Sequence, residues 1–185
     1  MTVAPTPGQT IGPFFGYALP YPGSDELVRP GTPGAIRLHG QVTDGAGDPV
    51  PDALLEIWQA GADGVVPSAT GSLHRDGWTF TGWGRASTDD EGHYSFTTVE
   101  PGAPQPDTAA FFAVAVFARG LLNRLFTRIY VPGPALAGDR LLASLDAQRR
   151  QTLVARRDAE GLRFDIRLQG GADETVFLRF PGHQP

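Results

Sequence analysis

The sequence predicts a mostly β protein, an antiparallel β-sandwich with one short helix and an N-terminal arm rich in proline and glycine. Three observations support this fold class. The 185 residues include 24 glycines and 17 prolines, which favour many turns between short strands over long helices. Several segments alternate apolar and polar residues with period two, as half-buried strands do. About eight such segments follow one another between turn signals, a spacing typical of a sandwich.

The chain divides at residue 35. Residues 1–34 combine many prolines and glycines with aromatic residues and show no clear period, so we expect an arm that packs on a partner subunit. Residues 35–185 carry the periodic segments and are expected to form the sandwich domain. A chain of this length is enough for one well-buried domain.

The first two strands are predicted by their alternation and by the turn between them. In residues 35–44, apolar side chains such as Ile36 and Leu38 alternate with polar ones. Glycine, aspartate and proline at residues 44–49 form a turn signal. The second strand is expected at residues 53–60.

The remaining strands follow similar signals. Residues 82–102 supply two strands around a turn at residues 89–92, and we expect these to pair as antiparallel neighbours. Five more segments have the composition of strands: residues 111–118, 124–131, 152–158, 162–170 and 175–180.

Residues 139–150 lack the pattern of a strand and are expected to form the one helix. Asp139 is a suitable N-cap, and two arginines near the end suit a helix C-terminus. Three leucines fall on one face of this helix, at positions 141, 142 and 145.

Composition excludes several function classes. A net charge of −5 without a concentrated basic face argues against nucleic-acid binding, which needs clustered cations. No apolar segment approaches the ~20 residues that a bilayer requires, and residues 1–10 lack the pattern of a signal peptide, so we expect a cytoplasmic protein with no membrane contact. The absence of cysteine excludes disulfides, zinc–thiolate sites and thiol nucleophiles.

The residues that could hold a metal or act as acid and base are sparse. The four histidines, at positions 39, 74, 93 and 183, never stand two or four residues apart, which argues against a metal site within this chain. Asp89 and Asp90 fit a capped turn better than acid–base work. Glu56 lies within a strand and needs a partner, so we expect a structural ion pair or an interface contact.

Arg119 raises a sharper question, because it ends the apolar run at residues 111–118. One interpretation is a solvent-exposed arginine at a strand end. The other is recognition of a carboxylate, for which a guanidinium offers permanent charge and two parallel donors.

Six motifs bear on this choice because of their order along the chain. They read QTIGPFF, LHGQVTDGAGDPVPDALLEIWQAGADG, GWGRASTDDEGHYSFTTVEPG, FARG, TRIYV and LRFDIRLQGGADETVFLRF. In this order they resemble the intradiol ring-cleavage dioxygenases, and in particular the alpha-type chains of members built from two kinds of chain. The resemblance extends over nearly the whole sequence.

The resemblance implies that a homologous beta chain holds a ferric ion with two tyrosines and two histidines. This chain departs from that set: Ala113 and Ala115 stand where a His-x-His pair would be, and Val66 and Pro104 stand near the tyrosine positions. Methyl and isopropyl groups cannot ligate iron. We therefore expect this chain to bind no iron and to be inactive alone, with Fe(3+) held by the beta subunit.

The resemblance also implies the reaction and the role of this chain. The complex would cleave 3,4-dihydroxybenzoate with O2 to 3-carboxy-cis,cis-muconate, and alpha–beta pairs would assemble into a higher oligomer. Arg119 would neutralise the substrate carboxylate, while Thr10, Gly12 and Pro13 would line the same pocket. Phe14 stands where relatives often carry tyrosine, so a phenolic hydrogen bond would be lost there.

Two alternatives remain open from the sequence. The strand pattern also resembles transthyretin-like and carboxypeptidase-regulatory-like sandwiches, which would make the chain a binding module without catalysis. Those domains lack the arm motif and FARG. A homo-oligomeric enzyme with an unrelated ligand set is the third possibility, and it would require tight iron binding by the chain alone.

Overall fold

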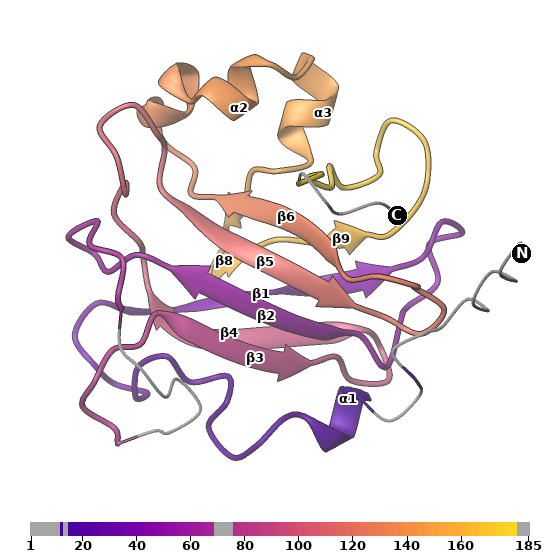
Figure 1. Ribbon diagram of the computed structural model, residues 1–185, viewed down its shortest axis with the longest axis horizontal. Coiled ribbons are helices and arrows are strands. Elements are labelled where there is room, and N and C mark those ends of the chain that lie inside the picture. Colours follow the sequence, from indigo (N-terminus) through magenta and orange to yellow (C-terminus); the bar gives the residue numbers. More distant parts are fainter. Residues whose placement is uncertain (1–11, 13–14, 69–75, 181–185) are drawn as a thin grey trace, which may run out of the picture.

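The computed structural model describes residue 12, residues 15–68 and residues 76–180. Two sheets pack against each other, and short helices lie at their margins (Figure 1). The prediction of a mostly β sandwich is confirmed. The strands are β1 (Ala35–Thr43), β2 (Leu54–Gln59), β3 (Trp83–Ser87), β4 (His93–Val99), β5 (Phe111–Phe117), β6 (Leu125–Tyr130), β7 (Arg156–Arg157), β8 (Gly161–Arg163) and β9 (Ile166–Arg167).

The first sheet has the order β4-β1-β8-β7, with β9 also paired to β1, and the second has the order β3-β2-β5-β6. Every pairing in the second sheet is antiparallel. In the first sheet β1 runs antiparallel to β4 but parallel to β8 and β9. The sandwich is therefore mixed and not purely antiparallel, because the C-terminal strands return alongside β1 in its own direction.

The expected pairing of the two strands around residues 89–92 is wrong, because β3 and β4 belong to different sheets. Thr88 still bonds to the residue that precedes β2, the strand partner of β3, since its backbone N–H donates to Ala53 O over 2.9 Å. Four residues later the chain has crossed over, and Gly92 O accepts from Val42 N of β1 over 2.8 Å. The turn thus forms a corner between sheets, so that each strand buries one face in the common core.

The core lies between the two sheets and follows the predicted alternation. Leu38 of β1, Ile57 of β2 and Val114 of β5 are among its fully or almost fully buried side chains. Gly40 is required by close packing: a Cβ there would lie 1.8 Å from the backbone oxygen of Phe164. The apolar face of each strand therefore fixes which side chains remain on the outer faces.

The predicted helix is divided into α2 (Arg140–Ala143) and α3 (Ala147–Gln151), with η1 (Pro134–Gly138) before them. Asp139 is the N-cap of α2, as predicted, and accepts from two backbone N–H groups of its first turn. Asp146 accepts from Arg149 N and caps α3. The second aspartate begins a new helix, which is why the leucine face does not continue in one element. A further helix, α1 (Phe15–Ala18), means that the expectation of a single helix was wrong.

Two predicted C-terminal strands are reduced. Residues 152–158 contain only the two-residue strand β7 and one isolated bridge, between Val154 and Tyr130. Residues 175–180 contribute one isolated bridge, between Leu178 and Phe126. Thr175 and Val176 are both buried although they are adjacent, so this segment does not alternate as a strand would.

The described part of the arm packs on its own sandwich. Ser24 O accepts from Arg85 N over 2.7 Å, and Leu27, which is buried in the core, donates from its N–H to Thr97 O over 2.8 Å. Contact of residues 1–34 with a partner subunit stays a prediction. Within the described part of the chain, no helix is long and apolar enough to cross a membrane.

Candidate functional site

Arg119 lies in the turn that follows β5. Ala118 is buried and anchors the turn, since its backbone oxygen accepts from Leu121 N over 3.2 Å. Gly120 has a φ of 88°, in the left-handed region that favours glycine. Arg119 stands between these two residues, and 68% of its side chain is exposed. The turn therefore presents a cation at the surface beyond the end of an apolar strand.

Asp52 is the partner of Arg119. Its Oδ2 accepts from Arg119 Nε over 2.6 Å and also pairs with Arg119 Nη2. The exposed fraction of the Asp52 side chain is only 17%. One carboxylate oxygen therefore engages one edge of the guanidinium.

Arg119 also lies at the wall of a groove of about 900 Å³. The groove runs between the turn that follows β5 and the C-terminal segment. Four arginines line it, at positions 119, 124, 149 and 179, together with the carboxylates of Asp44 and Glu174. Its margin is thus predominantly cationic, in a chain whose net charge is negative.

The arm approaches this site through α1. A Cβ on Gly16 would lie 3.1 Å from the backbone oxygen of Asp52, so the helix contacts the turn that carries Asp52. Gly12 has a φ of 81°, which glycine adopts without strain. Thr10, Pro13 and Phe14 lie outside the described residues. The structure thus brings α1, Asp52 and Arg119 together. A role in substrate binding stays a prediction for Arg119, Thr10, Gly12 and Pro13.

Ala113 and Ala115 occupy the outer face of the second sheet. Ala115 stands opposite Glu56 on one side and Phe126 on the other. Ala113 stands opposite Trp58 and Arg128. Directly opposed residues of neighbouring strands project from the same face, so these side chains surround the two alanines.

Glu56 forms a structural ion pair, the first of the two roles predicted for it. Arg85 lies opposite it on β3 and donates from Nε to Glu56 Oε1 over 2.9 Å. Both side chains are largely buried, with 15% of Arg85 and 19% of Glu56 exposed. This carboxylate is therefore already engaged by a cation.

Val66 and Pro104 belong to two loops that contact each other. Gly102 N donates to Gly61 O over 2.8 Å, and a Cβ on Gly64 would lie 2.4 Å from the backbone oxygen of Ala103. Val66 is 64% exposed. The two loops named by the resemblance are therefore neighbours, although neither position carries a ligand atom.

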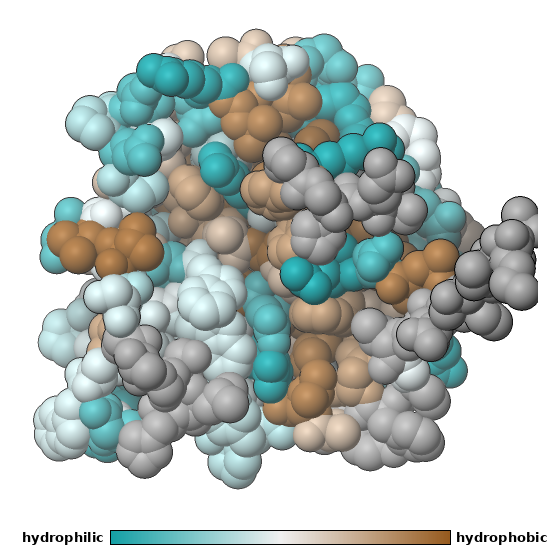
Figure 2. All heavy atoms as spheres, in the orientation of Figure 1, coloured by the Kyte–Doolittle hydropathy of each residue, from teal (hydrophilic) through white to brown (hydrophobic). Residues whose placement is uncertain are grey.

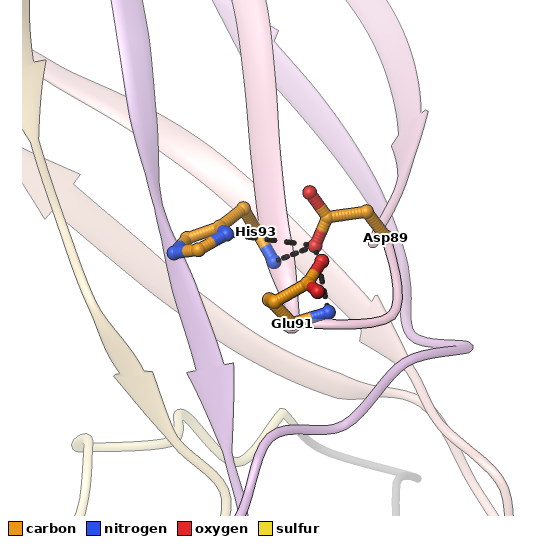
Figure 3. A group of neighbouring side chains, drawn as sticks. All are labelled: Asp89, Glu91 and His93. Atoms are coloured by element: carbon orange, nitrogen blue, oxygen red, sulfur yellow. Dashed lines mark hydrogen bonds and ion pairs between the residues drawn. The ribbon is translucent and has the colours of Figure 1, made fainter.

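One group of potential metal-ligating side chains occurs in the described residues, at the corner between β3 and β4 (Figure 3). Asp89, Glu91 and His93 are all exposed, and their ligand atoms lie within 4.8 Å of one another. Asp89 Oδ1 accepts from Glu91 N over 3.1 Å and from His93 N over 2.7 Å, as in a capped turn. These hydrogen bonds account for Asp89 as a turn residue, the role predicted for it.

Two buried tyrosines are held in their neutral form. Burial raises the pKa of Tyr94, whose hydroxyl donates to Phe164 O over 2.6 Å, and the nearby charge of Asp165 raises it further. Burial also raises the pKa of Tyr130 to about 12. Its hydroxyl donates to Asp139 Oδ1 over 3.1 Å. Both hydroxyl groups donate hydrogen bonds within the protein, and neither is suited to act as a phenolate ligand.

Comparison with known proteins places these features in a family. Residues 24–170 match the family model described as "Dioxygenase". The protocatechuate 3,4-dioxygenase alpha chain of Burkholderia cepacia is 39% identical, over 96% of this chain and 98% of that one. The chain belongs to the intradiol dioxygenase family.

Two other members of the intradiol dioxygenase family extend the comparison. The protocatechuate 3,4-dioxygenase beta chain of Burkholderia cepacia is 33% identical, over 73% of this chain and 64% of that one. The dioxygenase domain of a dioxygenase and carbohydrate-binding protein fusion from Streptomyces sp. SirexAA-E superposes with a TM-score of 0.58 and 29% identity. It covers 91% of this chain and 100% of that one. Both alpha and beta chains are thus relatives of this intradiol dioxygenase chain.

Intradiol dioxygenases are iron enzymes, but the four positions that the resemblance assigns to iron ligands do not fit iron in this chain. The side chains at Ala113, Ala115, Val66 and Pro104 carry no donor atom. Among the described residues opposite these alanines, the carboxylate of Glu56 is paired with a guanidinium that would repel a ferric ion. The chemistry of this face is that of a closed ion pair and not of an open metal site.

Asp52 was missed by the sequence reasoning. It lies in a quoted motif, yet nothing local distinguishes it from an ordinary turn aspartate. Its partner stands 67 residues away in the sequence. Only the folded arrangement identifies this aspartate as part of the site.

Proposed function

We propose that this chain is the alpha subunit of a protocatechuate 3,4-dioxygenase. With a homologous beta subunit that holds Fe(3+), it would cleave 3,4-dihydroxybenzoate between the two hydroxyl-bearing carbons. Both atoms of O2 enter the product, 3-carboxy-cis,cis-muconate. The observation that carries the proposal is the 39% identity to an alpha chain over almost the full length of both proteins.

We assign the iron to the beta subunit because the ligand positions of this chain lack donor atoms. A chain with alanine, valine and proline at the ligand positions depends on its partner for the ion. The beta chain relative at 33% identity supports such a partner. We further propose a cytoplasmic assembly in which alpha–beta pairs form a higher oligomer, and in which this chain is inactive alone.

In the proposed site, this chain supplies substrate recognition. Arg119 binds the carboxylate of the dihydroxybenzoate, and Thr10, Gly12 and Pro13 line the pocket from the arm. The exposure of the Arg119 side chain supports this role, because most of the guanidinium is accessible at the surface. Orientation of the ring by this contact would place the hydroxyl groups toward the partner's side of the pocket.

The test uses the two chains assembled together. Arg119→Ala is expected to raise the KM for protocatechuate by about 10- to 100-fold, the worth of a charge-assisted contact from which water is largely excluded. The KM for catechol, which lacks the carboxylate, is expected to remain unchanged. Equal effects on both substrates would remove Arg119 from the site.

A homologous neighbouring gene product offers an independent check. A partner chain with two tyrosines and a His-x-His strand is expected from the adjacent reading frame. The binding-module alternative lacks support, because the relatives that match nearly the whole chain are dioxygenase chains.

A further inference from the structure

We infer that Asp52 is a positioning residue for substrate recognition: it fixes Arg119 so that one edge of the guanidinium remains available for a carboxylate. The inference rests on the proposed function and adds to it a residue that acts through Arg119. It starts from the contact of Asp52 Oδ2 with Arg119 Nε at 2.6 Å and with Nη2 of the same side chain.

The geometry divides the donors of the guanidinium. Arginine has five N–H groups arranged along a rigid planar fork. Asp52 uses the edge formed by Nε and Nη2. Among residues 12, 15–68 and 76–180, no other hydrogen bond or ion pair engages Arg119. The edge formed by Nη1 and the second N–H of Nη2 is left for a bidentate contact with a ligand carboxylate.

The turn that carries Asp52 is held firmly. Thr88, which is only 7% exposed, accepts from Ala53 N over 2.9 Å and donates from its hydroxyl to Val50 O over 2.7 Å. Its own backbone N–H donates to Ala53 O over 2.9 Å. Asp52 lies inside this bonded segment, so its carboxylate starts from a fixed backbone.

The two partners differ in exposure, which sets their roles. The Asp52 side chain is 17% exposed, whereas that of Arg119 is 68% exposed. An exposed arginine without a partner samples many rotamers and loses that freedom when it binds a ligand. Contact with the shielded carboxylate restricts the guanidinium in advance, so less freedom is lost on substrate binding.

Asp52 also connects Arg119 with the arm. Its backbone oxygen lies against Gly16 of α1, where a Cβ would approach to 3.1 Å. The side chain of one residue therefore contacts Arg119 while its backbone contacts the helix that follows the arm motif. Asp52 therefore contacts both Arg119 and α1.

An opposing effect makes the inference testable. The negative charge of Asp52 would repel a substrate carboxylate bound at the same guanidinium. If this repulsion dominated, removal of the charge would tighten substrate binding. If positioning dominates, removal of the acceptor oxygen weakens it.

The experiment compares Asp52→Ala and Asp52→Asn in the assembled two-chain enzyme. Asp52→Ala is expected to raise the KM for protocatechuate about tenfold, as the loss of one oriented charge-assisted contact would do. Asp52→Asn keeps an acceptor oxygen and is expected to restore most of the affinity. The kcat for protocatechuate and the KM for catechol are expected to stay within about twofold of wild type in both variants.

Two further variants separate the possible outcomes. Asp107→Ala removes the acid of another arginine–aspartate pair, with Arg140, whose side chains are 49% and 86% exposed, and it is expected to leave the KM unchanged. In the Arg119→Ala background, Asp52→Ala is expected to add nothing, because a positioning residue has no effect without the group it positions. If Asp52→Ala fails to assemble, Asp52→Ser provides the same test with a polar turn residue.

The result that overturns the inference differs from the one that overturns the proposed function. If Arg119→Ala affects only protocatechuate but Asp52→Ala changes nothing, lowers the KM, or adds to the double variant, Asp52 does not position Arg119. If Arg119→Ala affects catechol and protocatechuate equally, the proposed role of Arg119 itself is wrong.

Discussion

Arg85 and Glu56 face each other across β3 and β2, directly beside Ala115, and form a largely buried ion pair. Arg85 also donates from Nη1 to Leu19 O over 2.9 Å and lies 5.1 Å from the centre of the Trp83 ring. The pair therefore joins the outer face of the second sheet to the arm. A carboxylate and a guanidinium thus occupy the outer face of the second sheet beside Ala115.

Replacement of Arg85 by methionine is expected to destabilise the protein by about 2 kcal/mol, because Glu56 would be left largely buried without its cation. Thermal unfolding of the variant measures this loss. Arg37→Met is the matched control, since the Arg37–Glu160 pair is 49% and 59% exposed and is expected to contribute below about 1 kcal/mol. Equal losses in the two variants would mean that burial does not decide the worth of these pairs.

The two helix caps differ in burial, and their removal is expected to differ accordingly. Asp139 is 1% exposed and accepts from Leu141 N, Leu142 N, Ala109 N and the Tyr130 hydroxyl. Asp139→Ala is expected to cost about 3 kcal/mol, because several buried donors lose their acceptor at once.

Asp146→Ala is the comparison, because Asp146 is an exposed N-cap that accepts from Arg149 N over 2.9 Å. It is expected to cost about 1 kcal/mol. Unfolding in denaturant measures both variants, and an Asp146 effect as large as that of Asp139 contradicts the assignment of Asp139 to a buried network.

Titration of Tyr130 is expected to lower the stability of the folded chain at alkaline pH. Its pKa is about 12 in the folded chain because the phenol is buried, against about 10 when unfolded. Between these values the unfolded chain has released the proton and the folded chain has kept it, so stability falls as pH rises. The stabilising contribution is complete below about pH 10 and declines by about 1.4 kcal/mol per pH unit above it.

The measurement is the free energy of unfolding from pH 9 to pH 11.5 for wild type and Tyr130→Phe. The variant is expected to have a lower free energy of unfolding at pH 9, since Asp139 loses a hydrogen-bond donor. Above pH 10 its free energy of unfolding is expected to decline less steeply than that of wild type. Identical slopes would show that Tyr130 does not titrate as its burial requires.

Local patterns predicted much of the fold. The positions of β1 to β6 followed from alternation and turn residues, and Asp139 was identified as an N-cap. The assignment of strands to sheets could not be predicted in this way. The turn at residues 89–92 has the residues of a hairpin, but its flanking strands join different sheets, and that choice depends on segments far away in the sequence.

The candidate site shows the same limit. Glu56 was expected to need a partner, but its opposition to Arg85 depends on the register of β2 and β3. Arg119 was singled out by its place after an apolar strand, whereas Asp52 had no local signal. The sequence also did not predict which large apolar side chains would be exposed. Figure 2 shows apolar side chains in several separate groups on one face, and Trp58, Trp78 and Leu122 are among the exposed ones of the molecule.

The decisive experiment is iron analysis of the separate and assembled chains. This chain and its beta partner would be purified apart, and then together, with iron content and protocatechuate turnover measured for each. We expect no stoichiometric iron and no turnover for this chain, with both appearing when the partner is present. One tightly bound iron per molecule of this chain alone, with unaided ring cleavage, would contradict this expectation.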